Sequence, residues 1–184
     1  MQWDTNLFFY LNSYAGRSVS VDAGIVFIAS WLPYILIAIF VLYLASKKSI
    51  SKKEKVVAIV TAGVAALIAR IGVGSPIRFF FPRPRPFLTY QVHQLIPEHA
   101  PSFPSGHALF FFAFSTVVYF YNKKLGVLLL VLSACVCIAR VAAGIHYPSD
   151  ITAGAGIGIL CGILTIQHLR PLIRGVVRRT YGIS

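Results

Sequence analysis

Residues 125–150 read LGVLLLVLSACVCIARVAAGIHYPSD, and this stretch decides the fold. From position 125 to position 143 the only charged side chain is that of Arg140. A helix needs roughly 20 apolar residues to cross the hydrocarbon core of a bilayer, which is about 30 Å thick. The stretch is therefore predicted to span a membrane as a helix and to end in a polar segment that contains His146 and Asp150.

Four further stretches are comparably apolar, namely residues 21–44, 56–73, 105–121 and 149–167. Of all 184 residues, 57% are hydrophobic and 12% are charged, whereas a soluble domain carries about 25% charged residues. This composition argues against a soluble globular protein and excludes a disordered chain. We predict an all-α, polytopic membrane helix bundle of five transmembrane spans in a single domain, residues 1–184, with Pro33 kinking the first span.

The N-terminal residues 3–14 are too few to span a membrane. Large apolar residues recur there at helical spacing: Trp3, Leu7, Leu11 and Tyr14. Asp4 and Asn12 lie off that face. This pattern predicts a short interfacial helix, the sixth of the chain. A helix packed against the bundle as a structural element is the alternative.

Basic residues orient the predicted bundle. The formal net charge is +12, from 17 Lys and Arg against 5 Asp and Glu. Eleven of the basic residues fall in three segments on one side of a five-span topology: Lys47, Lys48, Lys52, Lys53, Lys55, Lys123, Lys124, Arg170, Arg174, Arg178 and Arg179. By the positive-inside rule this side is the cytoplasm, so residues 74–104 and 144–148 are expected outside. Because the basic residues flank spans and form no separate patch, nucleic acid is not an expected partner.

The outer segments contain three polar blocks that the topology brings to one face of the membrane. They read RFFFPRPRP from Arg78 to Pro86, PSGH from Pro104 to His107, and RVAAGIHYPSD from Arg140 to Asp150. Ionisable residues gathered at membrane depth indicate a functional site.

Each block suits the binding or transfer of a phosphate. Arginine offers paired donors to phosphate oxygens, and three are present: Arg78, Arg85 and Arg140. Ser105 and Gly106 are expected at a helix start, where free backbone N–H groups favour an anion. His107 and His146 can supply a nucleophile and a general acid. Asp150, four residues after His146, can orient its imidazole.

This constellation resembles the type 2 phosphatidic acid phosphatase family of membrane lipid phosphatases over roughly residues 20–168. The family pattern is Lys, six residues, Arg-Pro; then Pro-Ser-Gly-His; then Ser-Arg, five residues, His, three residues, Asp. The chain matches the second block fully. It departs from the others at two positions, where Arg78 stands for Lys and Ala139 for Ser.

The resemblance implies a role for each matching residue. His146 would be the nucleophile that forms a phosphohistidine, Asp150 would orient it, and His107 would be the general acid. The phosphate would be bound by the remaining matches: Arg78, Arg85, Arg140, Ser105 and Gly106. The family uses no metal, so neither a metal ion nor another cofactor is expected.

The compact chain and its outward site look most like the bacterial undecaprenyl-diphosphate phosphatases of this family. The resemblance thus implies a multi-pass protein of the bacterial inner membrane that converts undecaprenyl diphosphate to undecaprenyl phosphate at the extracytoplasmic, or periplasmic, face. A phosphatidylglycerophosphate or phosphatidic acid phosphatase is the alternative within the class, and removal of a lipid A phosphate is a third. An anionic lipid transporter is the alternative from another class.

Several further residues are given ordinary structural roles. Arg83 is expected to reach the lipid headgroups, with contact to a second phosphate as the alternative, and Arg70 is expected to be structural or interfacial. His93, Glu98 and His99 are expected to be solvated loop residues, with lining of the site entrance as the alternative. Glycines 154, 158 and 162 have small-xxx-small spacing, which predicts close helix packing.

Overall fold

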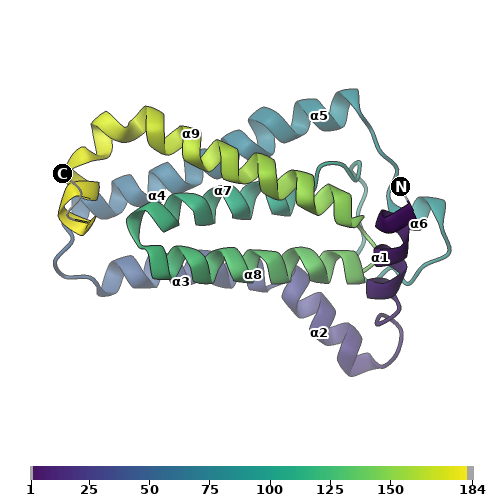
Figure 1. The fold of residues 1–184 in the computed structure, drawn as a ribbon. Coiled ribbons are helices and arrows are strands. Elements are labelled where there is room, and N and C mark those ends of the chain that lie inside the picture. Colours follow the sequence, from purple (N-terminus) through teal and green to yellow (C-terminus); the bar gives the residue numbers. More distant parts are fainter. Residues whose placement is uncertain (1, 182–184) are drawn as a thin grey trace.

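The computed structural model describes residues 2–181 and the side chains of residues 2–169. Within residues 2–181 every regular element is a helix (Figure 1). The elements are α1 (Gln2–Asn12), α2 (Val19–Ser30), α3 (Leu32–Ser46), α4 (Lys52–Leu67), the π-helical η1 (Ile68–Val73), α5 (Gly74–Phe80), α6 (Pro86–Thr89), α7 (Gly106–Tyr121), α8 (Lys123–Ala142) and α9 (Pro148–Tyr181). The prediction of an all-α membrane helix bundle is confirmed.

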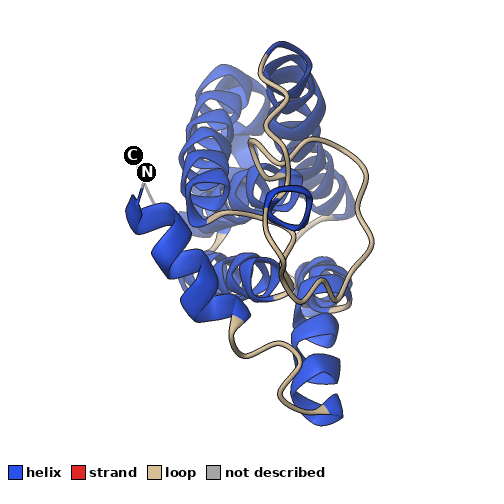
Figure 2. Ribbon diagram, turned by 90° about the vertical axis from the view of Figure 1, so that its right-hand side faces the viewer, coloured by secondary structure: helices blue, strands red, loops and turns tan. Residues whose placement is uncertain are grey.

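Helix α7 lies at the centre of the bundle and packs against α9, α8 and α4 (Figures 1 and 2). Its sequence is apolar around most of its circumference, which is typical of a helix buried on all sides. Side chains from α7 and α8, among them Leu109, Val117 and Leu129, have no exposed surface. The core therefore forms around α7, and the start of this helix fixes one end of the bundle.

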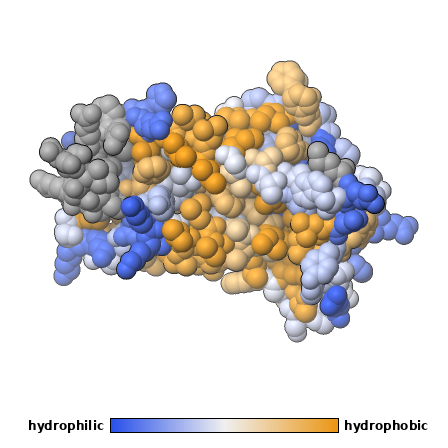
Figure 3. Space-filling view, in the orientation of Figure 1, coloured by the Kyte–Doolittle hydropathy of each residue, from blue (hydrophilic) through white to orange (hydrophobic). Residues whose placement is uncertain are grey.

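Among the residues that the structure describes, three helical segments are long and apolar enough to cross a membrane: Lys52–Phe80, Lys123–Ala142 and Pro148–Leu169. The pair α2 and α3 adds a fourth if it is one bent span. Helix α7 has 16 residues and a length of about 24 Å. Apolar residues cover the middle of the visible face, and more hydrophilic residues lie toward its two ends (Figure 3). The chain is thus an integral membrane protein. The predicted count of five spans requires that α7 also crosses the membrane, beside α8 and α9.

The first predicted span is broken, and Pro33 accounts for the break. Helices α2 and α3 meet at Trp31 with a bend of 48°, and Pro33 lies in the first turn of α3. Proline has no N–H to donate to the carbonyl four residues earlier, which is that of Ala29. Nη1 of Arg140 donates to this carbonyl at 3.5 Å. The predicted kink is confirmed, and it leaves a carbonyl free for an arginine of the candidate site.

The second predicted span extends further than its apolar pattern indicates. The helix continues from α4 through the π turn η1 into α5, so that Arg78 lies in the last turn of a helix. At the other end, Ser51 and Glu54 form a capping box, and Lys52, Lys53 and Lys55 lie inside the helix. The helix is therefore longer at both ends than the predicted span of residues 56–73.

Helix α1 packs across the end of the bundle, against α8 and α9. Trp3 and Leu7, on the predicted apolar face, are exposed, whereas Asp4, Phe8 and Asn12 are buried against the bundle. The helix thus packs as the structural element given as the alternative, with its apolar face outward. The polar groups face inward because each finds partners there. For example, Nδ2 of Asn12 donates to the carbonyl of Ala142 at 2.8 Å. The exposed aromatic face suits the interface between membrane and water.

Figure 1 places the α3–α4 and α7–α8 turns, which contain or adjoin all seven lysines of the chain, at the end of the bundle opposite α1. The predicted basic cluster also includes Arg170, Arg174, Arg178 and Arg179. These four lie outside the side chains that the structure describes.

Replacement of Gly158 by alanine should destabilise the protein. A Cβ built at Gly158 would lie 2.7 Å from the carbonyl oxygen of Leu109 and 3.1 Å from the backbone nitrogen of Ala113. Since α7 cannot move without disturbing the core, we expect overpacking to cost about 1–3 kcal/mol. Thermal unfolding in detergent measures this, with Gly156→Ala as control, because a Cβ at Gly156 has open space around it. Equal melting temperatures for the two variants would contradict the packing of α9 on α7.

Candidate active site

The site is built where α8 ends and α9 begins. Gly144 has φ +81°, a conformation that favours glycine, and its N–H donates to the carbonyl of Val141 at 3.0 Å. A Cβ at Gly144 would lie 2.5 Å from the carbonyl oxygen of His93. The turn sends the chain back toward the bundle, so His146 is buried beside the last turn of α8, which holds Arg140.

Asp150 caps α9 and contacts His146 with the same carboxylate. Its Oδ2 accepts the backbone N–H of Tyr147 at 2.8 Å, as a residue in the first helical turn does in a capping box. The same oxygen lies 3.4 Å from Nδ1 of His146 and accepts a short hydrogen bond from Oγ of Ser102. The carboxylate is therefore fixed from several directions and faces Nδ1 of the imidazole.

The other ring nitrogen of His146 faces an arginine. Nη1 of Arg85 lies 3.4 Å from Nε2. Burial, with smaller contributions from Arg140 and Arg85, lowers the pKa of His146 to about 4 against the opposing effect of Asp150. The imidazole is thus neutral near pH 7, and its Nε2 can carry a free electron pair.

Two buried arginines meet at a single carboxylate. Glu98 accepts hydrogen bonds from Nη2 of Arg85 at 3.4 Å and from Nη2 of Arg140 at short distance. Arg85 also donates to the backbone carbonyls of Ala100 and Ile145, both at 2.6 Å. Within the described side chains, Nε of Arg140 is buried and has no hydrogen-bond partner. A buried donor without a partner is uncommon, and a phosphate oxygen would supply the acceptor.

The start of α7 forms the opposite wall. Ser105 caps the helix, and its N–H donates to the carbonyl of Asp150 at 3.1 Å, which joins α7 to α9. Nε of Arg78 donates to the carbonyl of Pro104 at 3.2 Å. A Cβ on Gly106 would lie 2.9 Å from Nη2 of Arg78. Glycine thus lets the guanidinium approach the helix start closely.

His107 lies in the first turn of α7, with its ring stacked on Phe111 at a centroid distance of 6.1 Å. It is within electrostatic reach of His146, Arg140 and Arg85. The structure therefore gathers at one end of the bundle all the residues that the sequence motifs single out: Arg78, Arg85, Ser105, Gly106, His107, Arg140, His146 and Asp150.

Four contributors were not found by sequence reasoning: Asp4, Arg83, Ser102 and Glu98. Arg83 does not simply extend to the headgroups, because its Nη1 donates to Oδ1 of Asp150 at 2.7 Å. Glu98 is not a solvated loop residue, because it bridges two arginines. Arg70 lies nearer the site than expected, since its Nε would be 3.6 Å from a Cβ on Gly106.

This arrangement can bind an anion and attack it. The arginines and the helix start offer positive charge and N–H donors, and His146 offers a neutral, oriented nucleophile. In the part of the chain that the structure describes, no group of three or more His, Cys, Asp or Glu side chains is arranged to hold a metal ion.

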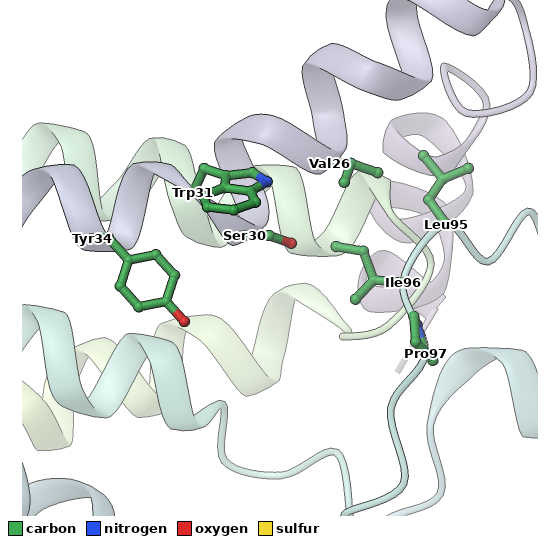
Figure 4. A pocket seen from close by; sticks show the side chains of 7 residues that line it. All are labelled: Val26, Ser30, Trp31, Tyr34, Leu95, Ile96 and Pro97. Atoms are coloured by element: carbon green, nitrogen blue, oxygen red, sulfur yellow. The ribbon is translucent and has the colours of Figure 1, made fainter.

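A largely apolar groove of about 430 Å³ lies beside the site. Figure 4 shows that one side comes from the break between α2 and α3 and the other from the extended segment 95–97. Its lining residues are Val26, Ser30, Trp31, Tyr34, Leu95, Ile96 and Pro97. Ser30 and Pro97 adjoin in sequence Ala29 and Glu98, which both bond to Arg140, so the groove lies next to partners of that arginine.

Comparison with known proteins is consistent with this site. The model of the PAP2 superfamily matches residues 56–174, which include all three motif blocks. A protein named undecaprenyl-diphosphatase BcrC, from Bacillus subtilis (strain 168), is 32% identical over 164 residues, which are 86% of this chain and 81% of that protein. A protein named bacitracin transport permease protein BcrC, from Bacillus licheniformis, is 30% identical over 158 residues, 85% of this chain and 75% of that protein.

Two crystal structures share the fold. LpxE from Aquifex aeolicus superposes with a TM-score of 0.71 at 26% identity, covering 90% of this chain and 95% of that chain. A PAP2 type phosphatidylglycerolphosphate phosphatase from Bacillus subtilis superposes with a TM-score of 0.67 at 19% identity, covering 92% of this chain and 86% of that chain.

Proposed function

Because the chain belongs to the PAP2 superfamily and is a membrane lipid phosphatase, we propose that it removes the terminal phosphate of undecaprenyl diphosphate through a phosphohistidine on His146. One observation carries the mechanism: the buried imidazole has a carboxylate at Nδ1 and an arginine at Nε2. Asp150 selects the tautomer that leaves Nε2 unprotonated, as the acid of a catalytic triad does.

In the first step Nε2 of His146 attacks the terminal phosphorus. The nitrogen–phosphorus bond forms while the bond from phosphorus to the bridging oxygen breaks, and undecaprenyl phosphate leaves. His107, at the start of α7, donates a proton to the departing oxygen. Charge that develops on the equatorial oxygens is stabilised by Arg78, Arg85 and Arg140.

In the second step a water molecule hydrolyses the phosphohistidine. His107, which has given up its proton, now accepts one from the attacking water. The nitrogen–phosphorus bond breaks, inorganic phosphate is released, and His146 returns to its neutral form. The same two imidazoles thus serve both steps.

The substrate assignment has two supports. The Bacillus subtilis relative is named an undecaprenyl-diphosphatase and aligns with most of this chain. The groove at the α2–α3 break is lined mainly by apolar side chains, and two of its lining residues adjoin the Arg140 partners Ala29 and Glu98. We assign to it the first isoprene units of the lipid, whose phosphates would then lie between the arginines.

Phosphatidylglycerophosphate and phosphatidic acid are the alternative substrates, because the phosphate-binding groups would be the same. Phosphate release from the purified protein across a panel of lipid phosphates distinguishes them. We expect the highest kcat/KM with undecaprenyl diphosphate. A higher value with either phospholipid would transfer the assignment to that lipid, and no release from any lipid would reject the function.

The rival function is transport of an anionic lipid, and the name of the Bacillus licheniformis relative is the observation that favours it. A transport pathway needs ionisable groups through the depth of the membrane. Here the motif residues gather at one end of the bundle. Reconstituted liposomes separate the two functions, because a transporter would move the lipid phosphate without releasing inorganic phosphate.

Activity should not depend on a divalent cation. His146 supplies the nucleophile and the arginines supply the positive charge that a metal ion would otherwise provide. Phosphate release should therefore persist in excess EDTA and be inhibited by vanadate, which resembles five-coordinate phosphorus. Activity that is lost in EDTA and restored by Mg²⁺ would contradict the proposed chemistry.

We propose that the protein lies in the bacterial inner membrane with its site facing outside. The support is the distribution of lysines. Lys47 follows the end of α3, and Lys52 and Lys123 begin α4 and α8. Figure 1 places these helix ends opposite the site. In a variant without native cysteines, His99→Cys should react with a membrane-impermeant thiol reagent on intact cells. Ser51→Cys should react only after the cells are opened. The reverse pattern would reject this orientation.

A further inference from the structure

A buried polar network connects the N-terminal helix to the candidate active site. Nη2 of Arg83 donates to Oδ2 of Asp4 at 2.9 Å, and Nη1 donates to Oδ1 of Asp150 at 2.7 Å. Asp4 comes from α1, Arg83 from the segment after α5, and Asp150 from the first turn of α9. The guanidinium of Arg83 therefore joins two carboxylates that lie far apart in the sequence.

Ser149 completes the network. Its backbone N–H donates to Oδ1 of Asp4 at 2.8 Å, and its hydroxyl donates to Oδ2 of Asp4 at 2.6 Å. The hydroxyl also accepts a hydrogen bond from Nη1 of Arg83 at 2.6 Å. Asp4 is 2% exposed, and Asp150 has no exposed surface. Carboxylates are buried to this extent only when they are paired and hydrogen-bonded.

Arg83 is fixed through both its side chain and its backbone. Its guanidinium lies over the ring of Tyr147, with Cζ 3.9 Å from the ring centroid. Its backbone carbonyl accepts the N–H of Ser102 at 2.9 Å, and the hydroxyl of Ser102 donates to Asp150. Burial alone would lower the pKa of Arg83, but the hydrogen bonds and charges of Asp4 and Asp150 raise it above its ordinary value. Arg83 is thus a permanent cation in a fixed position.

The two oxygens of Asp150 have separate tasks. Oδ2 faces His146 and accepts hydrogen bonds from the hydroxyl of Ser102 and the backbone N–H of Tyr147. Oδ1 accepts a hydrogen bond from Arg83. A guanidinium with no other partner would neutralise most of the charge on Asp150 and weaken its hold on the imidazole. Because Arg83 shares its charge with Asp4, Asp150 keeps a net negative charge toward His146.

We propose that Asp4 and Arg83 are positioning residues for the nucleophile: together they fix the side chain and the charge of Asp150, which makes the N-terminal helix part of the active site. This inference rests on the proposed role of His146. If Asp4 served only to attach α1 to the bundle, its two hydrogen bonds with Ser149 would be enough. That role would not explain why the guanidinium of Arg83, which binds Asp4, also binds Asp150.

A double-mutant cycle tests the proposal. The variants are Asp4→Asn, Arg83→Gln and their combination, each measured for kcat and KM of phosphate release from undecaprenyl diphosphate in detergent. Each single variant should lower kcat between about tenfold and a hundredfold, as changes to the outer partners of an active-site histidine do. KM should change less than twofold, because neither side chain is placed in contact with phosphate. The combined variant should be no slower than Arg83→Gln, since Asp4 acts through Arg83.

The matched control is Asp22→Asn, which also removes an N-terminal carboxylate. Oδ1 of Asp22 accepts the N–H of Gly16 at 2.8 Å, away from the site. This variant should keep the wild-type kcat. If Asp4→Asn does not fold, Ser149→Ala removes only the hydroxyl shared by Asp4 and Arg83 and should lower kcat in the same way.

The outcomes separate this inference from the proposed function. The inference is overturned if the wild type is active and Asp4→Asn, or Ser149→Ala in its place, has the kcat of Asp22→Asn. It is equally overturned if the effects of Asp4→Asn and Arg83→Gln multiply in the combined variant. A wild type that releases no phosphate would instead reject the proposed function itself.

Discussion

His146→Ala should abolish turnover on every phosphate substrate, by at least about a thousandfold in kcat, because no covalent intermediate can form. The structure leaves no substitute for this imidazole at the centre of the site: Asp150 and Ser102 lie on its Nδ1 side and Arg85 on its Nε2 side. Phosphate release from undecaprenyl diphosphate and from an aryl phosphate measures the effect.

The control for this prediction is His168→Ala. His168 is exposed on α9, and its Nδ1 contacts the carbonyl of Leu164 at 2.9 Å. That variant should have the wild-type kcat. Substantial turnover of the aryl phosphate by His146→Ala would show that His146 is not the nucleophile.

His107→Ala should have an effect that depends on the leaving group. General acid catalysis contributes about 10²–10⁴-fold, and it matters most when the departing oxygen is a strong base. We therefore expect a loss in that range for a lipid monophosphate, whose leaving group is an alkoxide. The loss should be smaller for a lipid diphosphate, whose leaving group is a phosphate, and smallest for an aryl phosphate with an acidic phenol.

The comparison requires kcat at saturating substrate, because His107 can also contribute to phosphate binding. Equal losses on all three substrates would contradict the general-acid role. Rescue of His146→Ala by the aryl phosphate, with no rescue of His107→Ala, would mean that the two histidines have the opposite roles.

The sequence was sufficient to predict the bundle because apolar stretches of span length leave few alternatives. It also predicted which residues meet, since three motif blocks on one side of the bundle must lie near one another. It also placed Ser105 and Gly106 at a helix start, which is the start of α7.

The partners of these residues could not be predicted because their contacts are remote in sequence. Asp4 and Ser149 are separated by 145 positions, and Glu98 and Arg140 by 42. No periodicity connects such pairs. For the same reason, the apolar pattern of α1 did not show that Asp4 and Asn12 pack against the bundle.

The long α4–α5 helix shows a second limit. Apolarity alone ended this span near Val73, but the helix continues through the π turn to Phe80. The interior of the bundle is polar at this depth, where Arg78 contacts the start of α7. A hydropathy pattern records the lipid-facing part of a helix and misses a turn that faces a polar site.

Transfer of phosphate to His146 can be observed by trapping the phosphoenzyme. Substrate carrying a ³²P label in the terminal phosphate should be mixed with the purified protein and the reaction stopped in alkali within milliseconds. Phosphohistidine survives alkali and is hydrolysed by acid. We predict alkali-stable, acid-labile label that maps to the peptide containing His146, forms in His107→Ala and is absent from His146→Ala. An active enzyme that carries no label at any time before steady state, or carries it on another residue, would contradict this transfer.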